Sequence, residues 1–350
     1  MVARRSTYVH TRHRAVVRIA APGARHRQVP GRTGQGAAGK LIAENAVNHG
    51  SWKTLDGKPS RIIAHRGASG YRPEHTLEAF ALALAQGADM LEPDLVASRD
   101  GKLFARHDFG LSRSTDVAAR AQFAARAREI GGERDWWIGD FEAHEIGALR
   151  AVQPDSGRDG RFDGQFGIAS FAALLDLVAQ GNRDRETPVV IEAEIKQPDA
   201  GVLAALAREL ESHDLAGERS PVWIECFDHA FLQRARERCG NPCIALLEPE
   251  DDWQRGDPRL RELARWVRGV APRKDMLWDS VGGDTRWVAA AHDLGLEVHA
   301  WTFRNDGNCT PFRSSEAELT AAFDLGVDAL FCDFPDSAIA ARAAWFNAKR

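Results

Sequence analysis

Short apolar runs rich in β-branched residues recur eight times along this sequence, and most of them are separated by stretches with a helical pattern. The helical pattern is clearest at 76–86, 200–210 and 289–294. Strands that alternate with helices predict a parallel sheet covered by helices, and eight such units predict that the sheet closes into a barrel. We therefore predict an α/β fold of the (β/α)8, or TIM barrel, type. The eight runs are 62–64, 90–92, 189–191, 222–224, 243–247, 267–270, 296–300 and 329–331.

The interval after the second run does not fit this repeat. There the pair Asp100-Gly101 stands between two extended stretches, and Asp-Gly is a strong hairpin signal. If these two residues form the turn, Asp94 lies directly opposite His107 on one face of the hairpin. We therefore predict a β-hairpin excursion after strand 2, followed by a long insert over about 108–167. Such a length exceeds that of ordinary loops and favours a functional element such as a lid.

The amino-terminal segment differs in composition from the rest of the chain. Residues 1–50 hold eight arginines, one acidic residue and no apolar periodicity. Basic, aromatic-poor segments usually stay unfolded, so we predict a basic, disordered extension over 1–55 and a barrel domain over 56–350. A targeting or polyanion-binding arm is the alternative for the extension. Its best apolar stretch, 15–21, is interrupted by Arg18, so no signal peptide is predicted and the cytoplasm is the default location.

Charge and cysteine content exclude several classes of protein. The net charge is −4, which gives no electrostatic case for binding nucleic acid. No apolar run approaches the roughly 20 residues that span a bilayer, so no integral membrane segment is expected. The five cysteines form no zinc-binding pattern, and a core of this size does not need disulfides. We expect a soluble protein with a small-molecule ligand, while the oligomeric state is left open.

Polar side chains end most of the predicted strands, where barrels of this type carry their catalytic groups. Because side chains alternate along a strand, residues two apart face the same side, as Glu92 and Asp94 do. The same holds for Glu192 and Glu194, and alternation alone leaves open which of these two belongs to a site. The strand-end residues are His65, Arg66, Glu92, Asp94, Glu192, Glu194, Lys196, Trp301 and Asp333.

These residue types together indicate a reaction at phosphorus. Carboxylates that converge without cationic partners repel one another, and a divalent cation removes that conflict. Oxygen ligands favour Ca²⁺ or Mg²⁺, either of which can polarise a phosphoryl oxygen. Arg66 and Lys196 add fixed positive charge that suits a phosphate. His65 and His107 can act as general base and general acid, because imidazole titrates near neutral pH. The combination predicts metal-dependent cleavage of a phosphodiester.

A series of short motifs follows the predicted strands, namely the run from His65 to Thr76, Gln86-Gly87-Ala88-Asp89, Glu92-Pro93-Asp94, His107-Asp108, Glu194-Ile195-Lys196, Glu225-Cys226-Phe227-Asp228, Trp301-Thr302 and Asp333-Phe334-Pro335-Asp336. In type and order these motifs resemble those of the glycerophosphodiester phosphodiesterases, over about 61–339. The form of the first motif, the segment 112–117 and the long insert resemble the bacterial periplasmic branch of that family, which typically uses calcium.

The resemblance implies a reaction and the residues that carry it. The reaction is hydrolysis of glycerophosphodiesters, such as glycerophosphocholine, to sn-glycerol 3-phosphate and an alcohol. Glu92, Asp94 and Glu194 would bind one divalent cation, Ca²⁺ or Mg²⁺. His65 and His107 would carry out acid–base catalysis. The resemblance thereby selects Glu194 from the two acids of its strand.

The resemblance also implies substrate contacts and bears on location. Arg66 and Lys196 would hold the phosphate, and Trp301 would line the glycerol pocket. The periplasmic branch normally begins with a signal peptide, which is not found here, so a periplasmic or secreted location stays open beside the cytoplasmic one. Two other functions stay open. One is a phosphodiesterase of the lysophospholipase D or phosphatidylinositol phospholipase type, which needs an apolar groove for acyl chains. The other is a non-catalytic barrel that binds phosphodiesters.

Overall fold

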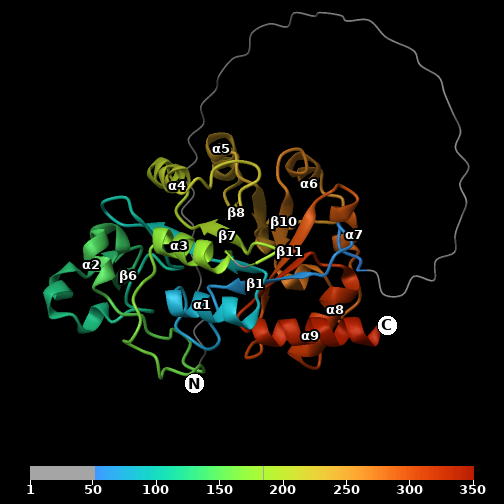
Figure 1. The fold of residues 1–350 in the computed structure, drawn as a ribbon, viewed down its shortest axis with the longest axis horizontal. Coiled ribbons are helices and arrows are strands. Elements are labelled where there is room, and N and C mark those ends of the chain that lie inside the picture. Colours follow the sequence, from blue (N-terminus) through green and yellow to red (C-terminus); the bar gives the residue numbers. More distant parts are fainter. Residues whose placement is uncertain (1–51, 184) are drawn as a thin grey trace, which may run out of the picture. The chain divides into compact units, whose positions relative to one another are not determined.

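The computed structural model describes residues 52–183 and 185–350 and confirms the predicted barrel (Figure 1). Eight parallel strands lie side by side in a ring, which closes because the last of them pairs with the first. Each of the eight predicted runs overlaps one strand. In ring order the strands are β1 (Arg61–His65), β2 (Met90–Glu92), β7 (Val190–Ile195), β8 (Val222–Cys226), β9 (Cys243–Leu247), β10 (Gly269–Pro272), β11 (Glu297–Phe303) and β12 (Ala329–Cys332).

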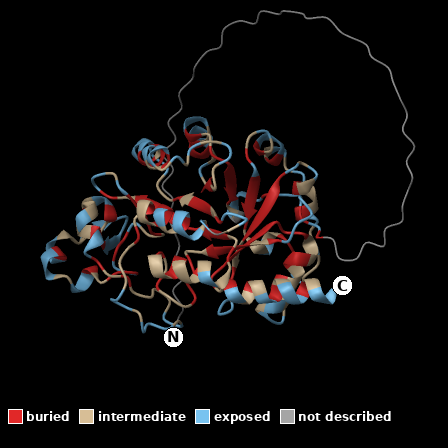
Figure 2. Cartoon of the chain, viewed as in Figure 1, coloured by how far each residue is buried: buried red, intermediate tan, exposed pale blue. Residues whose placement is uncertain are grey.

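Helices follow the strands and cover the outside of the barrel, where their apolar faces pack on strands that are largely buried (Figure 2). Side-chain caps fix where the helices begin, since the Thr76 hydroxyl accepts a hydrogen bond from the amide of Ala79, and Asp228 caps the amide of Phe231. The covering helices are α1 (Leu77–Gln86), α3 (Phe171–Gly181), α4 (Ala200–Ser212), α5 (His229–Cys239), α6 (Pro258–Leu263), α7 (Trp287–His292), α8 (Ser315–Leu325) and α9 (Pro335–Ala348).

The hairpin after the second barrel strand is present, but its predicted register is wrong. Strand β3 (Asp94–Ala97) pairs antiparallel with β4 (Leu103–Ala105). The amide of Arg106 donates to the carbonyl oxygen of Asp94 at 2.8 Å. Arg106, and not His107, therefore stands opposite Asp94.

The turn of this hairpin explains the shift. The amide of Ser98 donates to the carbonyl oxygen of Lys102 at 2.9 Å, and the Ser98 hydroxyl accepts a hydrogen bond from the amide of Lys102. The loop thus has three residues instead of two, and Gly101 occupies its left-handed position with a φ of 72°. Three-residue hairpin loops that end in such a glycine are the next most common type, and each moves the register by one residue.

The insert between β4 and α3 has a small apolar core of its own. The rings of Phe123 and Phe141 meet there edge to face, with centroids 5.0 Å apart. Val96 and Phe104 of the hairpin belong to the same core, so the insert is packed on the hairpin that leads into it. Its elements are η1 (Val117–Ala119), η2 (Ala121–Arg126), β5 (Arg128–Ile130), β6 (Glu133–Asp135), η3 (Ile138–Asp140) and α2 (Ala143–Gly147).

The predicted extension over 1–55 falls almost wholly outside the described residues and stays a prediction, as does the absence of a signal peptide. The described chain begins at Trp52, whose ring packs against those of Trp345 and Phe323 with centroids 4.3 Å and 5.8 Å away. Among the helices that the structure describes, none is both long and apolar enough to cross a membrane.

Candidate active site

The first strand delivers two site residues through a sharp turn. Strand β1 ends at His65, and the backbones of Arg66 and Gly67 then take positive φ angles of 61° and 83°. A Cβ atom at Gly67 would lie 2.7 Å from the backbone carbonyl carbon of Ala79 in α1. The turn therefore needs glycine at this position, because the helix backbone approaches it too closely for any side chain.

We expect Gly67→Ala to lower the free energy of unfolding by about 3 kcal/mol or more. The strain of a left-handed backbone and the steric clash of the new Cβ with α1 both destabilise the folded state. The matched control is Gly101→Ala, which also has a positive φ but has no atom within 4 Å of the added Cβ. We expect this control to lose about 1 kcal/mol. Urea denaturation at equilibrium measures both values, and equal losses would show that the contact with α1 contributes nothing.

His65 is held by a carboxylate at the end of the last strand. Its Nδ1 donates to Oδ1 of Asp333, directly after β12, at 2.6 Å. Its Nε2 lies 4.0 Å from Oε2 of Glu92. Burial and the charge of Arg66 lower the pKa of His65 in spite of the carboxylate beside it. A neutral imidazole with its proton on Nδ1 leaves Nε2 able to accept a proton.

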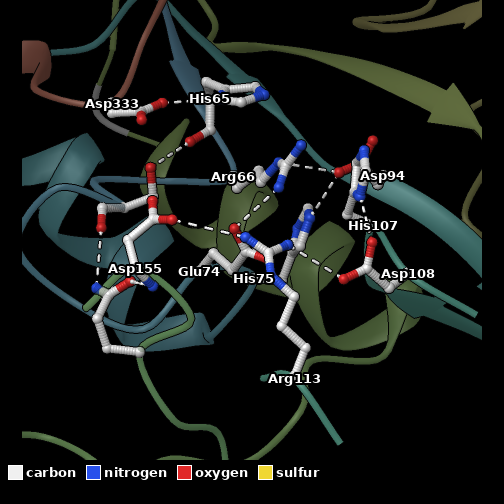
Figure 3. Close-up of polar contacts among 12 residues, drawn as sticks. His65, Arg66, Glu74, His75, Asp94, His107, Asp108, Arg113, Asp155 and Asp333 are labelled. Carbon is white, nitrogen blue, oxygen red and sulfur yellow. Dashed lines mark hydrogen bonds and ion pairs between the residues drawn. The ribbon is translucent and has the colours of Figure 1, made fainter. Parts of the chain in front are cut away.

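His107 is held in the same manner by the adjacent residue. Its Nδ1 donates to Oδ1 of Asp108 at 2.6 Å, and Oδ2 of the same carboxylate accepts a hydrogen bond from Arg113 at 3.1 Å. Strand β4 has already ended at Ala105, so the chain can turn, and the ring of His107 lies beside Asp94 despite the shifted register (Figure 3). The two predicted histidines therefore reach the same group of acids.

Four carboxylates from neighbouring strands gather at this end of the barrel. One oxygen each of Glu92, Glu194 and Glu225 lie within 4.8 Å of one another. Glu194 pairs in register with Glu225 on one side and with Asp94 on the other. One buried oxygen each of Glu92, Asp94 and Glu225 has no hydrogen-bond partner among the described residues. Unpartnered carboxylate oxygens at such short separation fit a divalent cation.

Burial favours the protonated form of three of these acids. Burial, followed by the charge of Asp94, raises the pKa of Glu92 well above its usual value. Burial raises the pKa of Glu194 to about 7, although the charge of Lys196 opposes the shift. Burial likewise raises the pKa of Glu225. A bound cation would displace these protons, since metal ligands must be deprotonated.

Asp94 behaves differently because cations surround it. Arg66 Nε lies 3.1 Å from its Oδ2, Lys196 Nζ lies 3.7 Å from its Oδ1, and His75 Nε2 donates to Oδ2 at 2.9 Å. Burial alone would raise the pKa of Asp94, but Arg66 and Lys196 lower it well below its usual value. Asp94 is therefore ionised and fixes the positions of its cationic neighbours.

The two predicted phosphate-binding cations lie at the mouth of the cluster. Arg66 Nη1 donates to Oε2 of Glu74 at 2.9 Å, and Lys196 Nζ lies 2.7 Å from Oε1 of Glu194. Their side chains keep 15% and 17% of their surfaces exposed, so each can still meet a ligand. Trp301 is half-buried, and its indole N–H donates to a backbone carbonyl in β10 at 2.9 Å.

The structure separates the two acids that alternation left open. Glu192 is fully buried in the barrel interior and accepts a hydrogen bond from Nδ1 of His299 at 2.8 Å. Glu194, one pleat further along β7, lies in the acidic cluster. The preference for Glu194 agrees with this placement.

Two residues near the cluster were missed as site residues in the sequence. Glu225 lies one residue before the end of β8, as Glu194 does in the neighbouring β7, so strand alternation together with sheet order could have found it. His75 lies in a loop, where no periodicity indicates the direction of a side chain. Its backbone has a φ of 60°, and its ring is buried against Asp94.

Similar proteins and structures bear on the family and the fold of this chain. A profile described as "Glycerophosphoryl diester phosphodiesterase family" matches residues 65–337. A glycerophosphodiester phosphodiesterase of Haemophilus influenzae is 28% identical over 351 residues, which cover 87% of this chain and 95% of that protein. One of Bacillus subtilis is 27% identical over 287 residues, covering 79% and 85%. The structure of an Oleispira antarctica phosphodiesterase in complex with its product sn-glycerol-3-phosphate superposes with a TM-score of 0.61 at 20% identity, covering 83% of this chain and 99% of that one.

Proposed function

This chain belongs to the glycerophosphoryl diester phosphodiesterase family, and we propose that His65 and His107 carry its reaction. It is an enzyme that hydrolyses glycerophosphodiesters to sn-glycerol 3-phosphate and an alcohol. One observation supports the role of the histidines above all others. Each donates its Nδ1 proton to a carboxylate at 2.6 Å, and each lies beside an acid of the cluster.

In this proposal the two imidazoles divide the proton transfers. One Nε2 takes the proton from the nucleophile, which is water or the neighbouring 2-hydroxyl of the glycerol. The other Nε2 gives a proton to the departing alcohol, so the leaving group does not depart as an alkoxide. Asp333 and Asp108 keep the rings in one tautomer and stabilise the imidazolium that forms.

Arg66 and Lys196 hold the phosphate in the same proposal. Both are ion-paired and partly exposed, so they form a positively charged surface that is already positioned before substrate binds. The planar guanidinium of Arg66 can contact two phosphate oxygens at once. Trp301 would line the glycerol pocket, since its ring is fixed edge to face against Phe227 with centroids 5.8 Å apart.

A divalent cation fits the acidic cluster, because one buried oxygen each of Glu92, Asp94 and Glu225 lacks a hydrogen-bond partner among the described residues. Burial also raises the pKa values of Glu92, Glu194 and Glu225. We propose Glu92, Asp94 and Glu194 as its ligands, joined by Glu225, and Ca²⁺ or Mg²⁺ as the ion. When bound, such an ion polarises a phosphoryl oxygen and offsets the negative charge that develops during hydrolysis.

A substrate panel tests the proposed reaction against the lysophospholipase D alternative. Charged residues surround the carboxylates that hold the two histidines. Arg113 is ion-paired with Asp108, Arg304 with Asp333, and Asp155 with both arginines. Such a rim favours a polar head group over an acyl chain. We expect glycerophosphocholine and glycerophosphoethanolamine to be hydrolysed at least about tenfold faster than lysophosphatidylcholine. Release of the free alcohol, choline or ethanolamine, from each substrate by purified protein with Ca²⁺ or Mg²⁺ measures this.

Each alternative gives a different result in the same assay. Faster turnover of lysophosphatidylcholine would assign the enzyme to lipid substrates. Binding of glycerophosphocholine without product, in the presence of either metal, would make the chain a phosphodiester-binding barrel and would overturn the proposal.

A further inference from the structure

The insert sends charged side chains toward both histidines, although none of them was singled out in the sequence. Arg158 is the most buried of these, with 4% of its side chain exposed. Asp155 lies one turn earlier, and Arg113 stands near the start of the insert. The proposed chemistry assigns no role to any of the three.

On the side of His65, Arg158 holds the carboxylate that orients the imidazole. Asp333 accepts the His65 proton with Oδ1, and its Oδ2 is ion-paired with Nη2 of Arg158. The same guanidinium donates to Oδ2 of Asp306 at 2.7 Å and to the carbonyl oxygen of Ser69 at 3.1 Å. A buried arginine that hydrogen-bonds to three residues has little freedom, so it fixes the rotamer of Asp333.

On the side of His107, Arg113 holds the carboxylate that orients the imidazole. Its Nη1 donates to Oδ2 of Asp108, whose Oδ1 holds the histidine. Its Nη2 lies 3.6 Å from Oδ1 of Asp155. This arginine is 49% exposed, so its ion pairs are screened by solvent and the link is the weaker of the two.

Asp155 joins the two sides. Its Oδ2 lies 3.5 Å from Nη1 of Arg158, and 3.1 Å from Nη2 of Arg304. Charges of alternating sign therefore run without a gap from one histidine to the other. Figure 3 shows the two histidine-bound carboxylates, Asp155 and Arg113. In order, the chain is His65, Asp333, Arg158, Asp155, Arg113, Asp108 and His107.

We infer that Arg158 and Asp155 are positioning residues, and that the insert sets the relative placement of the two histidines through this chain. The inference rests on the proposed function, since it concerns how the two catalytic rings are aligned. Neither residue needs to touch the substrate. Proton transfer depends steeply on geometry, and a misplacement of about 1 Å can cost about 10²-fold in rate.

Arg158→Met removes the guanidinium and keeps much of the side-chain volume. We expect it to lower kcat for glycerophosphocholine by about 10- to 100-fold and to leave KM within about threefold, because phosphate-binding groups are untouched. Arg158→Lys restores one charged contact and should recover part of the loss. Asp155→Asn, at a more exposed position, should lower kcat by a smaller factor, again with KM nearly unchanged.

Arg126→Met is the matched control. Arg126 also lies in the insert and is ion-paired with Glu145 at 2.6 Å, and no interaction between described residues links it to either histidine. We expect its kcat to equal that of the wild type. A comparable loss in this variant would show that any loosening of the insert impairs catalysis, and it would overturn a specific role for Arg158.

Coupling between the two ends is tested with Asp108→Asn in a double-mutant cycle. If the chain links the histidines, Arg158→Met should cost less in the Asp108→Asn background than in the wild type. Strictly multiplicative losses would overturn the link. Thermal melting checks that each variant is folded. If Arg158→Met does not fold, Asp155→Asn replaces it in the double-mutant cycle with Asp108→Asn. A folded Arg158→Met with wild-type kcat would overturn the inference, whereas an inactive wild type would instead refute the proposed function.

Discussion

Replacing His107 by asparagine is expected to lower kcat for glycerophosphocholine by about 10³-fold. Asparagine can still form a hydrogen bond with Asp108, but it cannot take up or release a proton near neutral pH. KM should change little, because Arg66 and Lys196 keep the phosphate-binding surface intact. Steady-state kinetics at a fixed, saturating metal concentration measures both constants.

His144→Asn is the matched control for this substitution. His144 lies in α2 with 77% of its side chain exposed, and its ring nitrogen is 3.4 Å from Glu142. This variant should retain full activity. Turnover by His107→Asn within about tenfold of the wild type would remove His107 from the mechanism, since general acid or base catalysis contributes at least about 10²-fold.

A second substrate separates the two possible roles of His107. The p-nitrophenyl ester of glycerol phosphate releases p-nitrophenolate, which needs no proton in order to depart. If His107 is the general acid, the variant should recover most of its rate on this ester. If His107 is the general base, the loss should be the same on both substrates.

The barrel could be predicted from the sequence because its signal is repeated. A strand of a parallel barrel is covered on both faces, so it appears as a short apolar run, and eight such runs are hard to produce by chance. The predicted hairpin register depended instead on the length of one loop, two residues or three. Asp100-Gly101 suits a two-residue turn, but Gly101 serves a three-residue loop here, held by the bonds between Ser98 and Lys102. Composition does not distinguish these two loops.

The strands themselves place part of the predicted site. His65 and Glu92 end their strands and Glu194 lies one residue before the end of its strand, so the closed barrel brings them together. Arg158 could not be found in this way, because it lies in an irregular part of the insert and reaches Asp333 across 175 positions of sequence. Long-range ion pairs of this kind leave no periodic pattern in the sequence.

Exhaustive chelation is expected to reduce the turnover of glycerophosphocholine to the background rate, and Ca²⁺ or Mg²⁺ should restore it. The physical reason lies in the acidic cluster, where burial penalises the charged forms of Glu92, Glu194 and Glu225 and raises their pKa values. A bound cation would compensate the buried negative charge and complete the site. Full activity after chelation would exclude a metal from the reaction.

Binding can be followed without activity, through the thermal stability of the chelated protein. A ligand present at 100 times its dissociation constant stabilises the folded state by about 2.7 kcal/mol, so titration with Ca²⁺ or Mg²⁺ should raise the melting temperature in a saturable manner.

Glu225→Gln keeps the shape of the side chain and removes one charged ligand. We expect it to shift the midpoint of this titration to a metal concentration at least about tenfold higher. Glu318→Gln is the control, since Glu318 is a buried carboxylate paired with Lys274 in another part of the fold. It should lower the melting temperature of the metal-free protein and leave the midpoint unchanged. An unchanged midpoint in Glu225→Gln would leave only Glu92, Asp94 and Glu194 as ligands.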